Sequence, residues 1–227
     1  MTTTVVSIRR YPVKAMGGES LESVEIDARG LVGDRAWAVR DGDDRLACGK
    51  NGSRFVRRDR IFEYAAHTTA GGVEIAGPAG TWFAGDTRAD AALTADFDAD
   101  VRVAQESDVP HFDDSPVSVI GTATLDWCAR ELGVDADPRR LRVNLVVETE
   151  RPFEEEAWDG EVRIGDVVFH TIKRVTRCRT IDQEQDGVDG RTAWLKALGG
   201  TRDLKAAVYL GIDRPGVVSV GDGVVTA

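Results

Sequence analysis

Residues 167–181 read VVFHTIKRVTRCRTI and say most about the fold and function of this chain. The first nine of them, VVFHTIKRV, are rich in β-branched residues and predict a β-strand. The strand leads to Cys178, which Arg174, Arg177 and Arg179 surround. No acidic residue occurs in this window, where the average acid density of the chain would put about two or three. The window is either a candidate site or a solvated basic strand edge, since edge charges discourage aggregation.

The rest of the chain is acidic. Its 227 residues include 39 Asp and Glu against 29 Lys and Arg, a net charge of −10. A phosphate backbone would repel such a chain, so we expect no nucleic acid partner. The N-terminus lacks the apolar core of a secretory signal, and no apolar run approaches the ~20 residues of a membrane span. We therefore expect a cytoplasmic protein that does not associate with a membrane.

The three cysteines are too far apart for a local metal motif. Cys48, Cys128 and Cys178 match no zinc or iron–sulfur spacing, and an odd number argues against a disulfide framework. Buried, inert thiols are the simplest interpretation of Cys48 and Cys128. Cys178 differs because its cationic neighbours favour the thiolate, the form that binds metals and attacks electrophiles.

The pattern of strands and turns predicts a mainly β protein with some α. Short strands separated by turns fill the first hundred residues, which is typical of an antiparallel barrel or sandwich. Helices are expected over TATLDWCAREL (122–132), closed by Gly133, and over RTAWLKAL (191–198). The stretch EEEAWDG (154–160) is expected to be a solvated acidic loop. The sequence contains no GxGxxG after a strand, no GxxxxGK[ST], no HExxH and no GxSxG, so common nucleotide-binding and hydrolase functions lose support.

Three segments together resemble one family. They are RYPVKAMGGESLESVEIDARGLVGDRAWAVRD, HFDDSPVSVIGTATLDWCARELGV with LRVNLVVE, and WDGEVRIGDVVFHTIKRVTRCRTIDQEQDG. In this order they resemble the molybdenum cofactor sulfurase C-terminal (MOSC) superfamily, and among its members the amidoxime-reducing components and their bacterial counterparts. The resemblance implies an N-terminal β-barrel region, residues 1–104, packed on a β-barrel-like MOSC domain, residues 105–227, that carries the cysteine.

The resemblance also implies a cofactor and its site. In this family a cysteine thiolate ligates the molybdenum of a molybdenum–pyranopterin cofactor, and here it would be Cys178, as metal ligand and catalytic residue. A soft thiolate suits a metal that already carries sulfur and oxygen ligands. The family positions that contact the cofactor fall on Lys14, Ala15, Arg35, Ser115, Arg142, Asn144, Thr176 and Arg177. Ala15 stands where relatives often have Ser, so a contact there must come from the backbone, and Val143 stands where they often have Pro.

The implied function is molybdenum-dependent reduction of N-hydroxylated compounds. Apart from Cys178 only two cysteines remain, too few for a four-cysteine iron–sulfur site, so electrons must come from an external donor of ferredoxin or flavoprotein type. We expect the basic patch of Lys173, Arg174 and Arg179 to dock this donor. Two alternatives remain open: a non-catalytic carrier of the cofactor, and a sulfur-transfer protein that uses a Cys178 persulfide.

Overall fold

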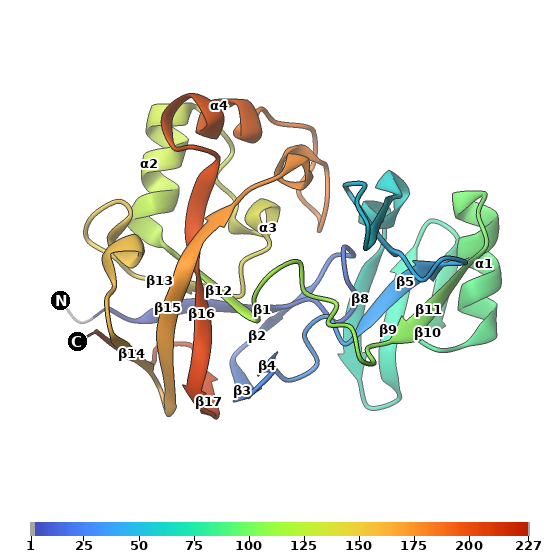
Figure 1. The fold of residues 1–227 in the computed structure, drawn as a ribbon, viewed down its shortest axis with the longest axis horizontal. Helices are drawn as coiled ribbons and strands as arrows, with labels where there is room; N and C mark the ends of the chain where they lie inside the picture. Colours follow the sequence, from blue (N-terminus) through green and yellow to red (C-terminus); the bar gives the residue numbers. More distant parts are fainter. Residues whose placement is uncertain (1–2, 227) are drawn as a thin grey trace.

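The computed structural model describes residues 3–226, and its strands and helices form two lobes that lie side by side (Figure 1). The larger lobe is built on an eight-stranded sheet. In spatial order its strands are β18 (Val224–Thr226), β14 (Glu161–Ile164), β15 (Val167–Thr176), β16 (Lys205–Arg214), β12 (Val117–Gly121), β13 (Leu145–Val147), β1 (Val5–Arg10) and β2 (Glu19–Leu21). A second, three-stranded sheet of this lobe has the order β17 (Gly216–Ser219), β3 (Ser23–Asp27) and β4 (Gly30–Leu31).

The smaller lobe holds two further sheets and one helix. One sheet has the order β11 (Val101–Gln105), β5 (Trp37–Asp41), β6 (Leu46–Cys48) and β7 (Phe55–Arg57), and the other β10 (Gly80–Phe83), β9 (Gly72–Gly77) and β8 (Ala65–Thr69). The remaining elements are α1 (Thr87–Phe97) in this lobe, α2 (Thr122–Leu132), α3 (Pro138–Leu141) and α4 (Trp194–Thr201) in the larger lobe, and the 3-10 helices η1 (Asp59–Glu63), η2 (Glu154–Ala157) and η3 (Arg179–Asp182).

The prediction of a mainly β protein with some α is confirmed, but the sheets are not closed into a barrel. The large sheet comes near to closure, because an isolated bridge joins Thr4, just before β1, to Gly223, just before β18. Only a few backbone hydrogen bonds flank that bridge, among them one from the Val5 amide to the Asp222 carbonyl at 2.9 Å and one from the Gly221 amide to the Val5 carbonyl at 2.8 Å. Residues 219–222 form a turn, in which the Asp222 amide donates to the Ser219 carbonyl and Gly221 has a φ of +90°.

The two lobes do not follow the order of the chain. Strands β1 and β2 are hydrogen-bonded into the same sheet as β12 to β16 and β18, and β3 pairs with β17. The chain therefore starts in the larger lobe, builds the smaller one, and returns. Residues 11–16, between β1 and β2, reach the smaller lobe, where Val13 bridges to Trp37, and they contribute directly to the candidate site. The division into domains after residue 104 remains a prediction.

Alternation along the strands separates the apolar residues into clusters. Val119 and Ile120 are neighbours on β12 but belong to different clusters, because successive strand residues point to opposite faces of a sheet. One face of the large sheet packs on β3, β4 and β17, and the other packs on α2 and α4 through Cys128 and Trp194, both fully buried. The smaller lobe has its own core.

Helix α2 matches the prediction, and α4 does not begin where the sequence indicated. Gly133 ends α2 in the left-handed conformation, with a φ of +63°. Helix α4 starts at Trp194 rather than at residue 191. The Asp182 carboxylate accepts a hydrogen bond from the Leu195 amide at 3.0 Å and so supplies the cap that Ala193 cannot.

The prediction of a solvated loop at 154–160 is wrong for its central residue. Glu155 lies in η2 and is fully buried, with Oε2 accepting a hydrogen bond from the Thr124 hydroxyl at 3.0 Å. Burial raises the pKa of Glu155. Three consecutive glutamates suggest exposure, but the chain reversal after β13 carries the middle one against α2. No helix within residues 3–226 has the length and apolar character needed to cross a membrane.

Candidate active site

Strand β15 delivers the cysteine to the space between the lobes. The strand ends at Thr176, and the Arg177 amide is held by the Leu204 carbonyl at 2.8 Å. Cys178 follows in an extended conformation and begins η3, with its thiol free and half-buried. Its Sγ lies 3.4 Å from the Thr180 hydroxyl. The thiol is therefore placed by a strand end and a tight turn rather than by a flexible loop.

One cavity brings all nine predicted site residues together. It encloses about 800 Å³ of space, part of it open to solvent, and both lobes contribute to its wall. Lys14 and Ala15 come from the loop between β1 and β2, Arg35 comes from the segment that links β4 to β5, and the others come from the larger lobe. The structure thus places these residues in one cavity, and the role of each as a cofactor contact remains a prediction.

Three of these residues have an unusual backbone. Ala15, Arg35 and Arg142 adopt positive φ angles of 68°, 51° and 52°, the left-handed region that non-glycine residues seldom occupy. Each such residue costs about 1 kcal/mol or more, and such conformations concentrate at functional sites. Seven other non-glycine residues of the described chain also have positive φ angles, but three of the nine predicted site residues share this strained conformation, which their surroundings must enforce.

Tyr11 holds the arginine side chains in place. Its ring is fully buried, and the guanidinium carbons of Arg142, Arg35 and Arg9 lie 4.2, 4.9 and 5.7 Å from the ring centroid. Asp34 accepts a hydrogen bond from the Tyr11 amide at 2.8 Å and pairs with Arg35. Cation–π contacts of this kind contribute about 0.5–2 kcal/mol each and direct both cavity arginines.

We expect Tyr11→Leu to lower the affinity of the cavity for anions by about tenfold, and Tyr11→Phe to leave it nearly unchanged, because the phenyl ring keeps the cation–π contacts. Titration of the protein without cofactor with inorganic phosphate, followed by calorimetry, measures the difference. An equal loss in Tyr11→Leu and Tyr11→Phe would assign the effect to the hydroxyl group, whose oxygen has no hydrogen-bond partner among the described residues.

Arg177 and Arg142 are two cations of the cavity whose charge no carboxylate neutralises. Arg177 donates through Nε to the Ala206 carbonyl at 2.9 Å and through Nη1 to the Leu141 carbonyl at 2.7 Å, while its buried Nη2 has no partner. Burial lowers the pKa of Arg177 to about 10, so it stays charged at neutral pH. Within residues 3–226 neither Arg177 nor Arg142 forms an ion pair with a carboxylate.

Lys14 is buried in the wall of the same cavity. Its Nζ donates to Asp113 Oδ1 and to the His111 carbonyl, both at 2.7 Å. Burial lowers the pKa of Lys14, and Asp113 partly opposes this effect. Burial alone would raise the pKa of Asp113, but Lys14 and Lys50 outweigh it and hold that pKa well below its usual range. Asp113 is therefore ionised and accepts the Lys14 hydrogen bond as a carboxylate.

Asn144 and Ser115 are placed differently from one another. Asn144 Oδ1 accepts from the Ser118 amide and hydroxyl at 3.2 and 3.1 Å, and Nδ2 donates to the Arg9 carbonyl at 3.2 Å. The Asn144 amide thus joins β12 to β1, and one of its two N–H groups is left for a ligand. Ser115 lies half-buried in the loop before β12 and reaches the cavity ahead of Pro116.

Sequence reasoning missed several residues of the cavity wall. Asp113 and Arg140 flank predicted residues and could have been suspected from that proximity alone. Tyr209, on β16, and Cys48, at the end of β6, carry no motif in the sequence. With these included, five basic side chains (Lys14, Arg35, Arg140, Arg142 and Arg177) face one acidic side chain, Asp113. A strongly acidic chain thus builds a positively charged cavity, which favours an anionic ligand.

His111 contacts two of the cavity residues, Arg35 and Lys14. It is fully buried; Arg40 donates to its Nε2 at 2.9 Å, and its Nδ1–H therefore donates to the Arg35 carbonyl at 3.0 Å. Its own carbonyl accepts from Lys14. Burial, with a further contribution from Arg40, lowers the pKa of His111 to about 4.

This pKa predicts a loss of stability in acid. The unfolded chain binds a proton at His111 near pH 6.5 and the folded chain only near pH 4, so stability present above pH 6.5 is lost as the pH falls toward 4. After allowance for solvent screening the loss is roughly 1–2 kcal/mol. Urea denaturation of the wild type and of His111→Gln at about pH 7.5 and 4.5 measures it. Identical changes in both proteins would show that His111 does not contribute.

Comparison with known proteins places this chain in a family. Residues 100–225 match the MOSC domain model, and residues 2–133 match the model of the MOSC N-terminal beta barrel domain. The chain belongs to the MOSC family, and the resemblance seen in the sequence is confirmed.

The similar proteins are distant ones. Mitochondrial amidoxime-reducing component 1 of Mus musculus is 23% identical over 97% of this chain and 81% of its own length. Mitochondrial amidoxime reducing component 2 of Bos taurus is also 23% identical, over 97% of this chain and 82% of its own. The crystal structure of the YuaD protein from Bacillus subtilis superposes with a TM-score of 0.52 at 14% identity, covering 99% of this chain and 94% of that one, and shows the fold alone.

Proposed function

We propose that this protein holds a molybdenum–pyranopterin cofactor, with the Cys178 thiolate as protein ligand of the metal, and reduces N-hydroxylated compounds. The observation that carries the proposal is the joint presence, in one cavity, of a free thiol and of arginines without carboxylate partners. The relatives named amidoxime-reducing components support the reaction type.

The residues of the cavity fit such a cofactor. No group of three or more His, Cys, Asp or Glu in the described residues could hold a metal ion, so a metal bound at Cys178 must bring its remaining ligands with it. A pterin cofactor does so and ends in a phosphate, which Arg142 and the unpartnered Nη2 of Arg177 can bind by charge-assisted hydrogen bonds.

The side chains of the cavity would have different roles around a bound cofactor. When bound, the cofactor would supply a metal that passes two electrons from the external donor to the N–O bond. Tyr209 keeps its proton at neutral pH, because burial raises its pKa, and so places a proton donor in the wall. Lys14 and Asp113, which are in contact at 2.7 Å, fix another part of the wall. Each turnover consumes two electrons and two protons and converts an N-hydroxyl group into an N–H group and water.

The test uses protein purified from a host that makes the cofactor. We expect about one molybdenum per chain, turnover of a hydroxylamine with reduced viologen dye, and none with NADH alone. Bound molybdenum without dye-driven turnover would favour a carrier. A Cys178 mass increase of about 32 Da without molybdenum would favour sulfur transfer through a persulfide.

A further inference from the structure

A second basic segment lies at the rim of the cavity. Residues 49–58 read GKNGSRFVRR and connect the end of β6 to β7. They hold four basic residues and no acidic one, although the chain as a whole has a net charge of −10. We refer to residues 49–58 as the rim segment.

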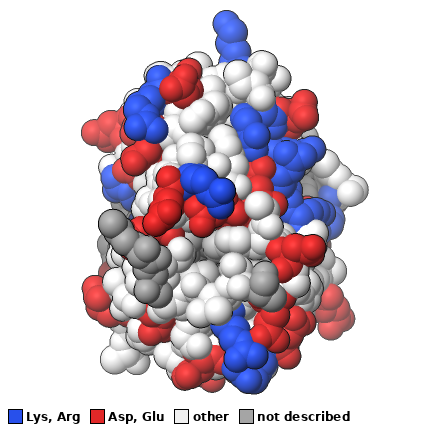
Figure 2. Space-filling view, turned by 90° about the vertical axis from the view of Figure 1, so that its left-hand side faces the viewer, with Lys and Arg blue, Asp and Glu red and all other residues white. Residues whose placement is uncertain are grey.

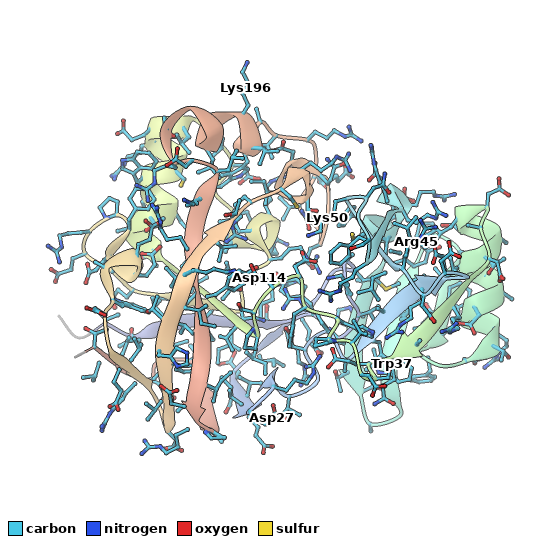
Figure 3. The ribbon with its side chains drawn as sticks, viewed as in Figure 1. Asp27, Trp37, Arg45, Lys50, Asp114 and Lys196 are labelled. Atoms are coloured by element: carbon cyan, nitrogen blue, oxygen red, sulfur yellow. The ribbon has the colours of Figure 1, made fainter. Side chains whose placement is uncertain are left out.

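The rim segment touches the residues that follow Cys178. Arg179 Nη1 donates to the Gly49 carbonyl at 2.9 Å, and a Cβ on Gly49 would lie 2.6 Å from the Thr180 hydroxyl. Cys48, just before the segment, lines the cavity and pairs in register with Arg57 of β7. Lys50 lies between the two lobes in Figure 3. The segment thus borders the entrance on the side of the thiol.

Much of the positive charge of the rim segment is not neutralised. Lys50 Nζ lies 3.5 Å from Asp113, and Arg57 shares Asp59 with Arg179. Arg54 donates only to the carbonyls of Pro110 and Phe112, and Arg58 only to that of Arg57. Within residues 3–226 Arg54 and Arg58 have no carboxylate partner. The four basic residues of the rim segment and Arg179 together have only two carboxylate partners, Asp113 and Asp59.

The patch that the sequence suggested for donor docking is, in contrast, neutralised. Lys173 pairs with Asp114 at 2.8 Å and Arg174 approaches Glu156 at 3.6 Å, while Arg179 pairs with Asp59 at 2.7 Å. Figure 2 shows the left-hand end of the molecule in Figure 1, where blue and red side chains are also intermixed. Such a surface gives little net attraction to a charged partner.

We propose that the rim segment is the docking surface for the electron donor, a small acidic redox protein. This inference rests on the proposed function, which needs two electrons per turnover from outside the chain. The donor gives them up and is itself oxidised. A second hollow, which borders η1, is lined by five acidic residues and two arginines, so negative charge gathers next to the rim segment. This asymmetry orients an acidic partner toward the rim segment and away from the acidic side.

The test compares two double variants that each remove two positive charges. Arg54→Ser with Arg58→Ser alters the rim segment at its two arginines that have no carboxylate partner within residues 3–226. Arg88→Ser with Arg151→Ser is the control, since both arginines are highly exposed and pair with a local carboxylate. The Kd of each holoenzyme for a plant-type ferredoxin is measured at low ionic strength, together with the ratio of ferredoxin-driven to dye-driven rates.

We expect the rim variant to raise the Kd about tenfold and to lower the rate ratio by a similar factor, and the control to change both by less than about twofold. Equal effects of the two variants, or an unchanged Kd in the rim variant, would overturn the proposal. So would binding of the segment to anionic phosphatidylserine vesicles without an effect on ferredoxin. If the wild type shows no dye-driven turnover, the proposed function fails, while the Kd comparison still reports on the surface.

Discussion

Cys178→Ala is expected to abolish dye-driven reduction of a hydroxylamine, with a loss of at least about a thousandfold, equivalent to roughly 4 kcal/mol of transition-state stabilisation. The reason is geometric as well as chemical. Cys178 stands between the end of β15 and the first turn of η3, and the described residues offer no metal-binding cluster that could replace it. The rates of wild type and variant, divided by their molybdenum contents, measure the effect.

Cys48→Ala is the matched control, because Cys48 is the other thiol of the same cavity. Burial raises the pKa of Cys48, so it stays protonated and is a poor ligand. We expect Cys48→Ala to keep most of the activity. X-ray absorption at the molybdenum edge should show one sulfur fewer at the metal in Cys178→Ala only. An unchanged sulfur count in that variant would rule out Cys178 as the ligand.

The sequence could predict features that depend on local patterns. The β-branched run before Cys178 predicted β15, and the apolar spacing with Gly133 predicted α2, because periodicity and capping act over a few residues. The family resemblance then named nine residues that the structure places in one cavity. Their grouping does not follow from spacing, since Lys14 and Cys178 are separated by most of the chain.

Features created by tertiary contacts could not be predicted in this way. The start of α4 depends on Asp182, outside the helix, and the burial of Glu155 depends on how the chain turns onto α2. The left-handed backbone of Arg35 and Arg142 is likewise invisible in the sequence, because non-glycine residues adopt it only when their surroundings enforce it. Backbone hydrogen bonds fix both turns: the Arg35 amide donates to the Tyr11 carbonyl at 2.7 Å, and the Arg142 amide donates to the Arg139 carbonyl at 3.1 Å.

Arg177 provides the second large expected effect. We expect Arg177→Met to weaken retention of the cofactor about thirtyfold, or roughly 2 kcal/mol, because it removes a buried charge whose Nη2 is free to bind an anion. The stability of the protein without cofactor should change little. The variant leaves the Ala206 and Leu141 carbonyls without a donor, but it also removes a buried cation that lacks a carboxylate partner in the described structure.

Arg140→Met separates a binding role from a structural one. Arg140 is also a buried arginine of the same cavity, but its side chain is fully used: it pairs with Asp135 and donates to the carbonyls of Gln183, Asp189 and Gly190. We therefore expect Arg140→Met to lower the unfolding free energy by about 3 kcal/mol or more. Urea denaturation of the cofactor-free proteins and molybdenum content after dialysis give the two readouts. If Arg177→Met lost stability like Arg140→Met and kept its molybdenum, the unpartnered nitrogen would have no part in binding.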